Sequence, residues 1–170
     1  MTARILTQAR LKELLHYDAE TGIFTWIKPS CNRVKAGGIA GYKCKTHGYI
    51  FIGVDNVNYR AHRLAWLYMT GEWPENQIDH VNHLRSDNRW NKLRSVSHQE
   101  NSKNAPIRST NKSGVTGVHF HKPLKKWVAY ITVSGTRIHL GLFNCITAAA
   151  ISRKAAEIKY NFHENHGATL

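Results

Sequence analysis

The sequence predicts an α+β protein in two parts, the second of which is a three-stranded antiparallel sheet packed on one helix. Three alternating runs of apolar and polar residues near the C-terminus precede an alanine-rich stretch with helical spacing. The N-terminal half mixes short helical and strand patterns, and a polar, basic stretch separates the two parts. The chain has 170 residues, 42% of them hydrophobic, which is room for one ordinary domain or two small ones with real cores.

The N-terminal part begins with a predicted helix over residues 7–15. A capping residue and leucines on one face support it: Thr7, Leu11, Leu14 and Leu15. The DAETG sequence that follows indicates a turn, and residues 23–26 (IFTW) a short strand. Residues 28–47 have no clear periodicity, so we expect a loop with a piece of strand near 39–42.

A hairpin and a helix are predicted next. Residues 48–54 (GYIFIGV) and 58–62 (NYRAH) flank a turn-like Asp-Asn pair, which favours two antiparallel strands. The run RLAWLYMT is apolar at helical spacing, and Gly71 after it suits a C-cap.

Residues 74–101 are dense in Asn, Asp, His and Arg. Few apolar residues interrupt them: Ile78, Val81, Leu84, Trp90, Leu93 and Val96. So few apolar groups cannot build a large core, and a metal ion or a polar network is the natural organiser. We expect a strand, a polar loop, a second strand and a short helix that Ser97 caps.

Residues 102–113 are polar and basic and make the best linker in the chain. The three strand patterns after it are GVTGVHF, KWVAYITV and TRIHLGLF, separated by Lys-Pro and Ser-Gly turn signals. A helix begins near Thr147.

Alternation assigns the side chains of the three strands to two faces. The core face takes Val118, Phe120, Trp127, Ala129, Ile131, Val133, Ile138, Leu140 and Leu142. The opposite face takes His119, His121, Val128, Tyr130, Thr132, Arg137 and His139. Trp127 is ambiguous between packing and contact with a ligand, and its place in the pleat favours packing.

Positive charge is the strongest global signal. The chain carries 24 Lys and Arg against 11 Asp and Glu, and residues 101–156 contain no acidic residue. Such a stretch favours a polyanionic partner, through phosphate contacts and counterion release. A chain that is basic for no functional reason would be expected to scatter some carboxylates through so long a segment.

The cysteines indicate neither a disulfide framework nor a zinc ribbon. Cys31, Cys44 and Cys145 lie far apart and form no CxxC pair. We therefore expect a reducing, cytoplasmic setting and no zinc cluster. No N-terminal apolar run suits a signal peptide, and no stretch is long enough to span a membrane.

Three polar residues have the chemistry that phosphodiester hydrolysis needs. An attacking water must lose a proton, which suits a histidine, and charge that develops on phosphoryl oxygens suits a hard cation on oxygen ligands. Asp79 and His80 are adjacent, and Asn101 follows twenty-one positions after His80. From the residues alone, a surface Asp-His pair in a polar loop is an equally good interpretation.

The stretch AHRLAW…DHVNHLRSDNRWNKLR…QENSKN resembles the HNH homing endonucleases of phages and mobile introns. The resemblance covers about residues 58–104 and implies a ββα-metal nuclease module. It implies His80 as the general base, and Asp79 and Asn101 as ligands of one Mg²⁺ or Mn²⁺ ion. Asn88 and Arg89 match residues of the loop that stiffens the site.

Other residues in the same stretch have plainer interpretations. His62 and Arg63 match a pair in the family for which we expect a structural role, and His83 and His98 match no ligand position. Lys92 stands where the family pattern has Asn, and Asn91 is one position early. Either Asn91 substitutes, or Lys92 is tolerated, or the site is weakened.

The C-terminal part resembles the plant ethylene-response (APETALA-type) DNA-binding domain. The matching residues are Gly114, Gly117, Val118, Trp127, Val128, Ala129, Ile131, Leu140, Gly141 and Phe143. In that family the outer face of the sheet lies in the major groove of DNA. The resemblance thus implies duplex DNA contacts by His119, His121, Lys125, Lys126, Tyr130, Thr132, Arg137 and His139.

We therefore expect a metal-dependent DNA endonuclease of homing type, as a monomer or a dimer. Its predicted parts are a nuclease domain over residues 1–104, a basic linker over 105–112 and a DNA-binding domain over 113–170. An alternative is a DNA-binding transcriptional regulator whose nuclease-like half is inactive. RNA binding fits the charge equally, but the sheet lacks the paired exposed aromatics of an RNA stacking platform.

Overall fold

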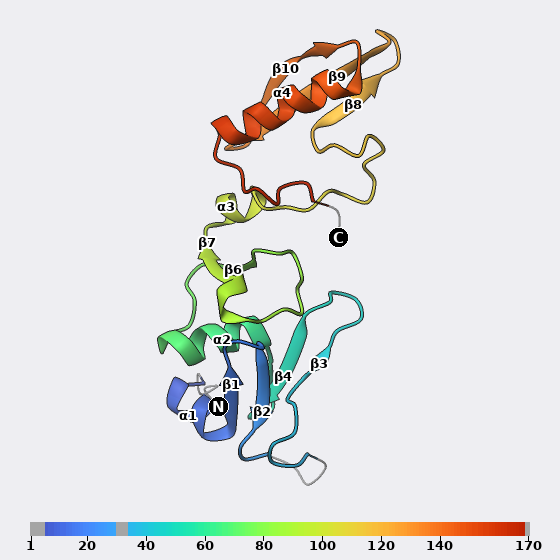
Figure 1. Ribbon diagram of the computed structural model, residues 1–170. Coiled ribbons are helices and arrows are strands. Elements are labelled where there is room, and N and C mark those ends of the chain that lie inside the picture. The colour runs from blue at the N-terminus through green and yellow to red at the C-terminus, as the bar shows by residue number, and fades with distance from the viewer. Residues whose placement is uncertain (1–5, 30–33, 169–170) are drawn as a thin grey trace. The chain divides into compact units, whose positions relative to one another are not determined.

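The computed structural model describes residues 6–29 and 34–168, so Cys31 lies outside the described residues. The chain divides into two compact units, Met1–Val96 and Ser97–Leu170, which we call unit 1 and unit 2 (Figure 1). The α+β class predicted from the sequence is confirmed, because each unit combines helices with antiparallel strands. None of the helices in the described part of the chain is long and apolar enough to cross a membrane.

Unit 1 begins with helix α1 (Gln8–Leu14), whose N-terminus is capped by the Thr7 hydroxyl as predicted. Strand β1 (Leu15–Asp18) follows directly and pairs antiparallel with β2 (Ile23–Trp26) across the DAETG turn. The sequence did not predict β1, because four residues next to a helix carry too few alternations to indicate a strand.

The predicted hairpin and helix of unit 1 are confirmed, except that Ala61 and His62, which were predicted to end a strand, begin the helix. Strands β3 (Tyr42–Lys43), β4 (Ile50–Val54) and β5 (Val57–Arg60) form a sheet in that order. Asp55 and Asn56 make the β4–β5 turn with positive φ angles of 48° and 65°, which this turn requires. Helix α2 (Ala61–Thr70) ends at Gly71 in the left-handed conformation.

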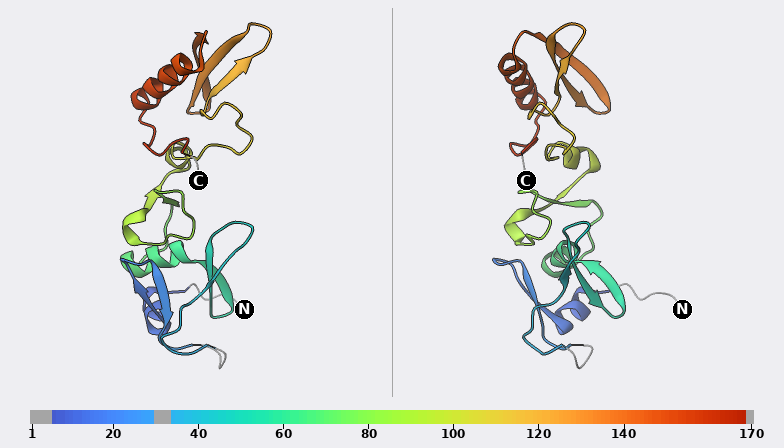
Figure 2. Two further views of the ribbon diagram at one scale, coloured as in Figure 1. Left: turned by 45° about the vertical axis from the view of Figure 1, so that its right-hand side comes forward. Right: turned by 90° about the vertical axis from the view of Figure 1, so that its right-hand side faces the viewer.

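The core of unit 1 lies between α1, α2 and the strands around them (Figure 2). Its largest fully buried side chains are Leu11, Leu15, Ile52, Leu64 and Leu67. Each such side chain contributes about 1.5–3 kcal/mol through removal from water. This apolar base supports the polar segment that follows.

The polar segment folds as predicted into strand, loop and strand. Strand β6 (Gln77–His80) pairs antiparallel with β7 (Leu93–Val96), and the loop 81–92 between them ends in the 3₁₀ turn η1 (Trp90–Lys92). Ile78 and Leu93 are buried against the core of unit 1. The hairpin is therefore anchored by a few apolar residues, and its loop is ordered by polar contacts.

Unit 2 begins with helix α3 (His98–Ser102), which Ser97 caps as predicted, in a capping box with Glu100. Strands β8 (Val118–His121), β9 (Lys126–Val133) and β10 (Thr136–Phe143) form an antiparallel sheet in the order β10-β9-β8. Helix α4 (Ile146–Lys159) packs across one face of this sheet (Figure 1). The predicted three-stranded sheet on one helix is confirmed.

A bulge in β10 corrects the predicted faces of that strand. His139 pairs with Tyr130 but Gly141 pairs with Ala129, so the register shifts at Leu140. Beyond the bulge the alternation is reversed, and Leu142 lies opposite Val128 on the outer face, where it is 45% exposed. Our assignment of Leu142 to the core face was wrong, because strict alternation takes no account of an extra residue.

The C-terminal tail of unit 2 pairs with the segment just after α3. The backbone N–H of His163 donates to Lys103, that of Gly167 to Ala105, and that of Ile107 to Ala168, at 2.9–3.2 Å. Much of the stretch predicted as a linker thus has backbone partners within unit 2. Composition indicates that a segment is polar, but it does not reveal such partners.

Candidate active site and nucleic-acid surface

Asp79 and His80 occupy the end of β6 and are 8% and 4% exposed. The β6–β7 register places Asp79 opposite Arg94 and His80 opposite Leu93. The N–H of Val81 donates to the carbonyl of Lys92 at 3.0 Å, so the pairing continues into the loop. The backbone of Asp79 and His80 is therefore held by pairing with β7 that extends into the loop.

Arg94 holds the carboxylate of Asp79. Its Nε and Nη2 donate to Oδ2 of Asp79 at 3.0 and 2.8 Å. Two charge-assisted bonds to one oxygen fix the orientation of the carboxylate in a buried place. Arg94 was not predicted as a site residue. In an antiparallel hairpin, residues at equal distances from the turn lie opposite each other, which places Arg94 opposite Asp79.

The imidazole of His80 is buried beside the amide of Asn88, with Nε2 3.4 Å from Oδ1. Burial lowers the pKa of His80, while the Asn88 contact and the charges of Asp79 and Asp87 oppose that shift. The ring is thus neutral at neutral pH. When Nε2 carries the proton, Nδ1 keeps the lone pair that a base requires.

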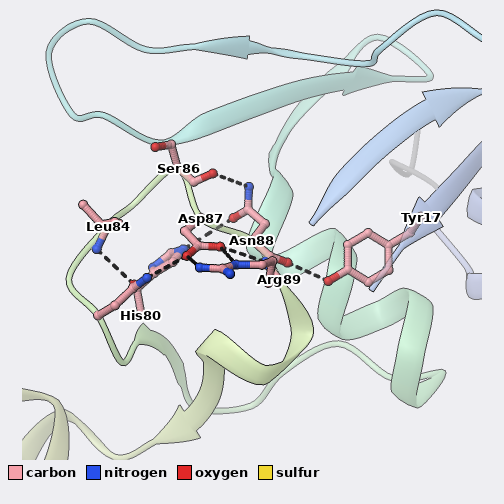
Figure 3. A network of polar contacts seen from close by, with 8 residues as sticks. Tyr17, His80, Leu84, Ser86, Asp87, Asn88 and Arg89 are labelled. Atoms are coloured by element: carbon pink, nitrogen blue, oxygen red, sulfur yellow. Dashed lines mark hydrogen bonds and ion pairs between the residues drawn. The ribbon is translucent and has the colours of Figure 1, made fainter. Parts of the chain in front are cut away.

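The loop 81–92 is organised around Asp87 (Figure 3). Arg89 donates to both oxygens of Asp87 at 2.8 and 2.6 Å, and the amide of Asn82 donates to Oδ2 at 2.6 Å. The Arg89 guanidinium holds the pKa of Asp87 down at about 2. Arg89 thus has a structural partner inside the loop, which stiffens the segment that carries Asn88.

The β1–β2 hairpin supports this loop from the side. The Tyr17 hydroxyl donates to the carbonyl of Asn88 at 2.6 Å (Figure 3), and the N–H of Trp90 donates to Ala19 at 2.9 Å. Gly22, with φ of 74°, lies so close that an added Cβ would be 2.4 Å from the backbone nitrogen of Arg89. Gly22 was predicted only as part of a turn. Its lack of a side chain also lets the β1–β2 hairpin lie close to the loop at Arg89.

Lys92 stands where the family pattern has Asn, and its surroundings explain why this residue is tolerated. Asn91 is exposed in η1, so its side chain does not take over the buried position of a loop-organising amide. Lys92 contributes its backbone carbonyl to Val81, a bond that is independent of the side chain. Asn88, which is 3% exposed, is the buried amide next to His80.

His62 lies against the site from α2. Its ring centroid is 5.0 Å from that of His80 and 5.1 Å from that of Tyr49. It is 4% exposed, and burial lowers its pKa to about 3. His62 therefore packs as a neutral ring under the base. His83, with φ of 61°, turns the loop just after the Asp-His pair.

Asn101 lies in α3, where its N–H donates to the carbonyl of Ser97 at 3.0 Å. Helix α3 belongs to unit 2, whereas Asp79 belongs to unit 1. Within the described ranges, no three His, Cys, Asp or Glu side chains gather as a metal-binding group. A carboxylate plus an amide is a set of oxygen donors that suits a hard divalent ion.

The site combines a buried histidine with an adjacent carboxylate that Arg94 orients, an arrangement that suits a hydrolase. Residues 59–103 match the family model described as HNH endonuclease. The chain therefore contains an HNH endonuclease domain at these residues, which implies hydrolysis of phosphodiester bonds in nucleic acid. No curated protein and no solved structure matches the chain.

The outer face of the unit 2 sheet gathers most of the predicted DNA-contacting residues. In the register, His119 lies opposite Val128, His121 opposite Lys126 and Arg137 opposite Thr132. The Arg137 guanidinium lies 4.1 Å from the centroid of the Tyr130 ring. The exposed residues on this face or its turn are His119, Lys125, Lys126, Thr132, Arg137 and His139. Trp127 packs instead against the core, edge-on to Phe120.

A cavity of about 780 Å³ continues this surface within unit 2. Its lining includes the outer-face residues Tyr130, Thr132 and Arg137, together with Arg108 and Asn111. None of its lining residues is acidic. The surface thus offers donors and positive charge over a wider area than the sheet alone.

Proposed function

We propose that this protein is a metal-dependent endonuclease that cleaves duplex DNA, with His80 as the general base. The carrying observation is the buried His80 directly after a carboxylate whose orientation Arg94 fixes. A neutral imidazole with a lone pair can take a proton from water as the water oxygen attacks phosphorus. Asn88 orients the ring through the contact at Nε2.

Asp79 and Asn101 would hold one Mg²⁺ or Mn²⁺ ion. The bound ion would neutralise the charge that develops on the phosphoryl and leaving oxygens. Arg94 supports the ligand role of Asp79, because it orients the carboxylate from the neighbouring strand. Asn88 and Arg89 keep the loop in place around the base, Arg89 through its pair with Asp87.

Unit 2 would bind the duplex and bring the nuclease domain to its target. The exposed, carboxylate-free outer face supports this role. Lys125 and Lys126 suit phosphate contacts, since a lysine at a turn reaches the backbone without bidentate geometry. Arg137 and the histidines at 119, 121 and 139 face the side that would meet base edges. A homing-type enzyme combines cleavage and targeting in this way.

A plasmid assay tests the enzymatic proposal. Wild type should relax or linearise supercoiled plasmid with Mg²⁺ or Mn²⁺ and lose this activity in EDTA. His80→Ala should be inactive, and His16→Ala, at an exposed position of β1, should cut as wild type does. If wild type leaves plasmid and its own genomic DNA intact while binding duplex, the regulator with an inactive nuclease half is the correct alternative.

A further inference from the structure

Two arginines from different segments of unit 1 meet on one aromatic ring beside His80. The guanidinium carbon of Arg60, the last residue of β5, lies 4.9 Å from the centroid of Tyr49. That of Arg85, in the loop 81–92, lies 5.1 Å from the same centroid. We call these three residues the Tyr49 cluster.

The Tyr49 cluster is next to the base. The ring of Tyr49 is 5.9 Å from that of His80 and 5.1 Å from that of His62, so one tyrosine separates the arginines from the histidines. The positive charge of Arg85 reaches His80, whose pKa it helps to lower. The charge of Arg60 acts on His62 in the same direction.

Both arginines lack an acidic partner in the part of unit 1 that the structure describes. The ion pairs there use Arg10, Lys28, Arg89 and Arg94. Arg60 and Arg85 are exposed, and the polar contact of Arg85 is a bond from Nη1 to the carbonyl of His47 at 3.2 Å. Two like charges held next to one ring repel each other, and a bound anion would offset that repulsion.

We propose that Arg60 and Arg85 bind backbone phosphates of the nucleic acid next to the phosphodiester that is hydrolysed with His80 as the general base. Arginine suits this task, because its planar guanidinium can stack on Tyr49 and still present donors to phosphate oxygens. Tyr49 sets the positions of both groups, so it is a positioning residue. The inference rests on the proposed function, since it assigns the substrate contacts of that site.

The test measures duplex binding by full-length protein carrying His80→Ala, so that it does not depend on cleavage. Added Arg60→Ala and Arg85→Ala should weaken binding of a duplex oligonucleotide at least tenfold at about 0.1 M salt. Each lost phosphate contact should also reduce the slope of log affinity against log salt by about 0.9. Lys12→Ala is the matched control, because Lys12 also lies over a tyrosine of unit 1, Tyr68, at 5.0 Å.

Conservative variants separate phosphate binding from a purely structural role. Arg60→Lys with Arg85→Lys should keep the salt slope, because the charges remain, and should lose part of the affinity with the stacking. Thermal unfolding identifies any variant that fails to fold, and in that case Arg60→Gln with Arg85→Gln replaces the alanines. Unchanged affinity and slope in folded variants without the two charges would overturn the inference.

The outcomes also separate this inference from the proposed function. If wild type cuts plasmid but loss of the two arginines leaves the salt slope unchanged, the nuclease proposal stands and the phosphate contacts do not. If wild type cuts no substrate but the slope falls, the phosphate contacts stand without the chemistry.

Discussion

The β6–β7 loop of unit 1 and the outer sheet face of unit 2 are both rich in polar residues, but they differ in burial. Asp79, His80 and Asn88 are each less than 10% exposed and are bonded to neighbours. On the sheet, Lys126, Thr132 and Arg137 are exposed. Buried polar groups must be oriented and partnered, whereas exposed ones remain available to a ligand.

This difference separates two tasks. A general base needs a fixed position and a neutral ring, which burial supplies at a cost in solvation. A docking face needs many donors that act additively, with no single one essential. Single substitutions should therefore have large effects in the loop of unit 1 and small ones on the sheet of unit 2.

The largest effect is expected for His80→Ala. Loss of a positioned general base should reduce the cleavage rate about 10²–10⁴-fold, while duplex affinity stays within about twofold. Single-turnover cleavage and fluorescence anisotropy measure the two quantities. A variant that cuts at the wild-type rate would show that the base is a different group.

A glycine pair tests how rigidly the loop is held. Gly22→Ala would place a Cβ 2.4 Å from the Arg89 nitrogen, whereas a Cβ at Gly37 meets nothing within 4 Å. Both have similar positive φ angles, 74° and 79°, so the backbone strain is matched. We expect Gly22→Ala to lower the free energy of unfolding by about 1–3 kcal/mol more than Gly37→Ala, from overpacking.

Chemical denaturation gives the comparison directly, and cleavage should fall with Gly22→Ala even under conditions where the variant is folded. Equal losses for the two variants would mean that the β1–β2 hairpin does not position the loop.

Much of the fold could be predicted from local patterns. Caps and turns such as Thr7, Asp55-Asn56, Gly71 and Ser97 are short-range signals, and each predicted boundary near them is confirmed. The bulge at Leu140 could not be predicted in this way, because it depends on how Gly141 pairs with Ala129 on the neighbouring strand. Strand β1 has only 4 residues, too few for an alternating pattern to predict a strand.

The candidate site also combines residues that the local sequence predicts with contacts between segments that it does not predict. The Asp-His dipeptide could be singled out in the sequence, and residues 59–103 match the family model described as HNH endonuclease. The partners that orient the site come from other segments: Tyr17 on Asn88, Arg94 on Asp79 and His62 under His80. The Tyr17–Asn88 contact joins residues 71 positions apart, and no local pattern predicts it.

The buried histidine of α2 predicts acid lability of unit 1. His62 has a folded pKa of about 3 against an ordinary value of 6.5, so between these values the unfolded state binds a proton that the folded state does not. Stability is complete above pH 6.5 and falls as the pH is lowered toward 3. We expect a loss of about 2 kcal/mol between pH 6.5 and pH 5 from this group.

Urea unfolding at several pH values measures this loss. His62→Phe removes the titrating group, so its unfolding free energy should depend less steeply on pH. A slope equal to that of wild type would assign the acid sensitivity to other groups.

The smallest effect per residue is expected on the sheet of unit 2. Lys125→Glu with Arg137→Glu should weaken duplex binding and lower its salt dependence, because two phosphate-facing charges are reversed. The fold should persist, since both side chains are exposed and neither belongs to the core of unit 2. Lys159→Glu, in α4 and outside the proposed face, is the control for one reversed charge, and its effect is compared with half of the change in log affinity of the double variant. If the control weakens binding as much, the basic charge of unit 2 acts as a whole and the outer face has no special part in DNA binding.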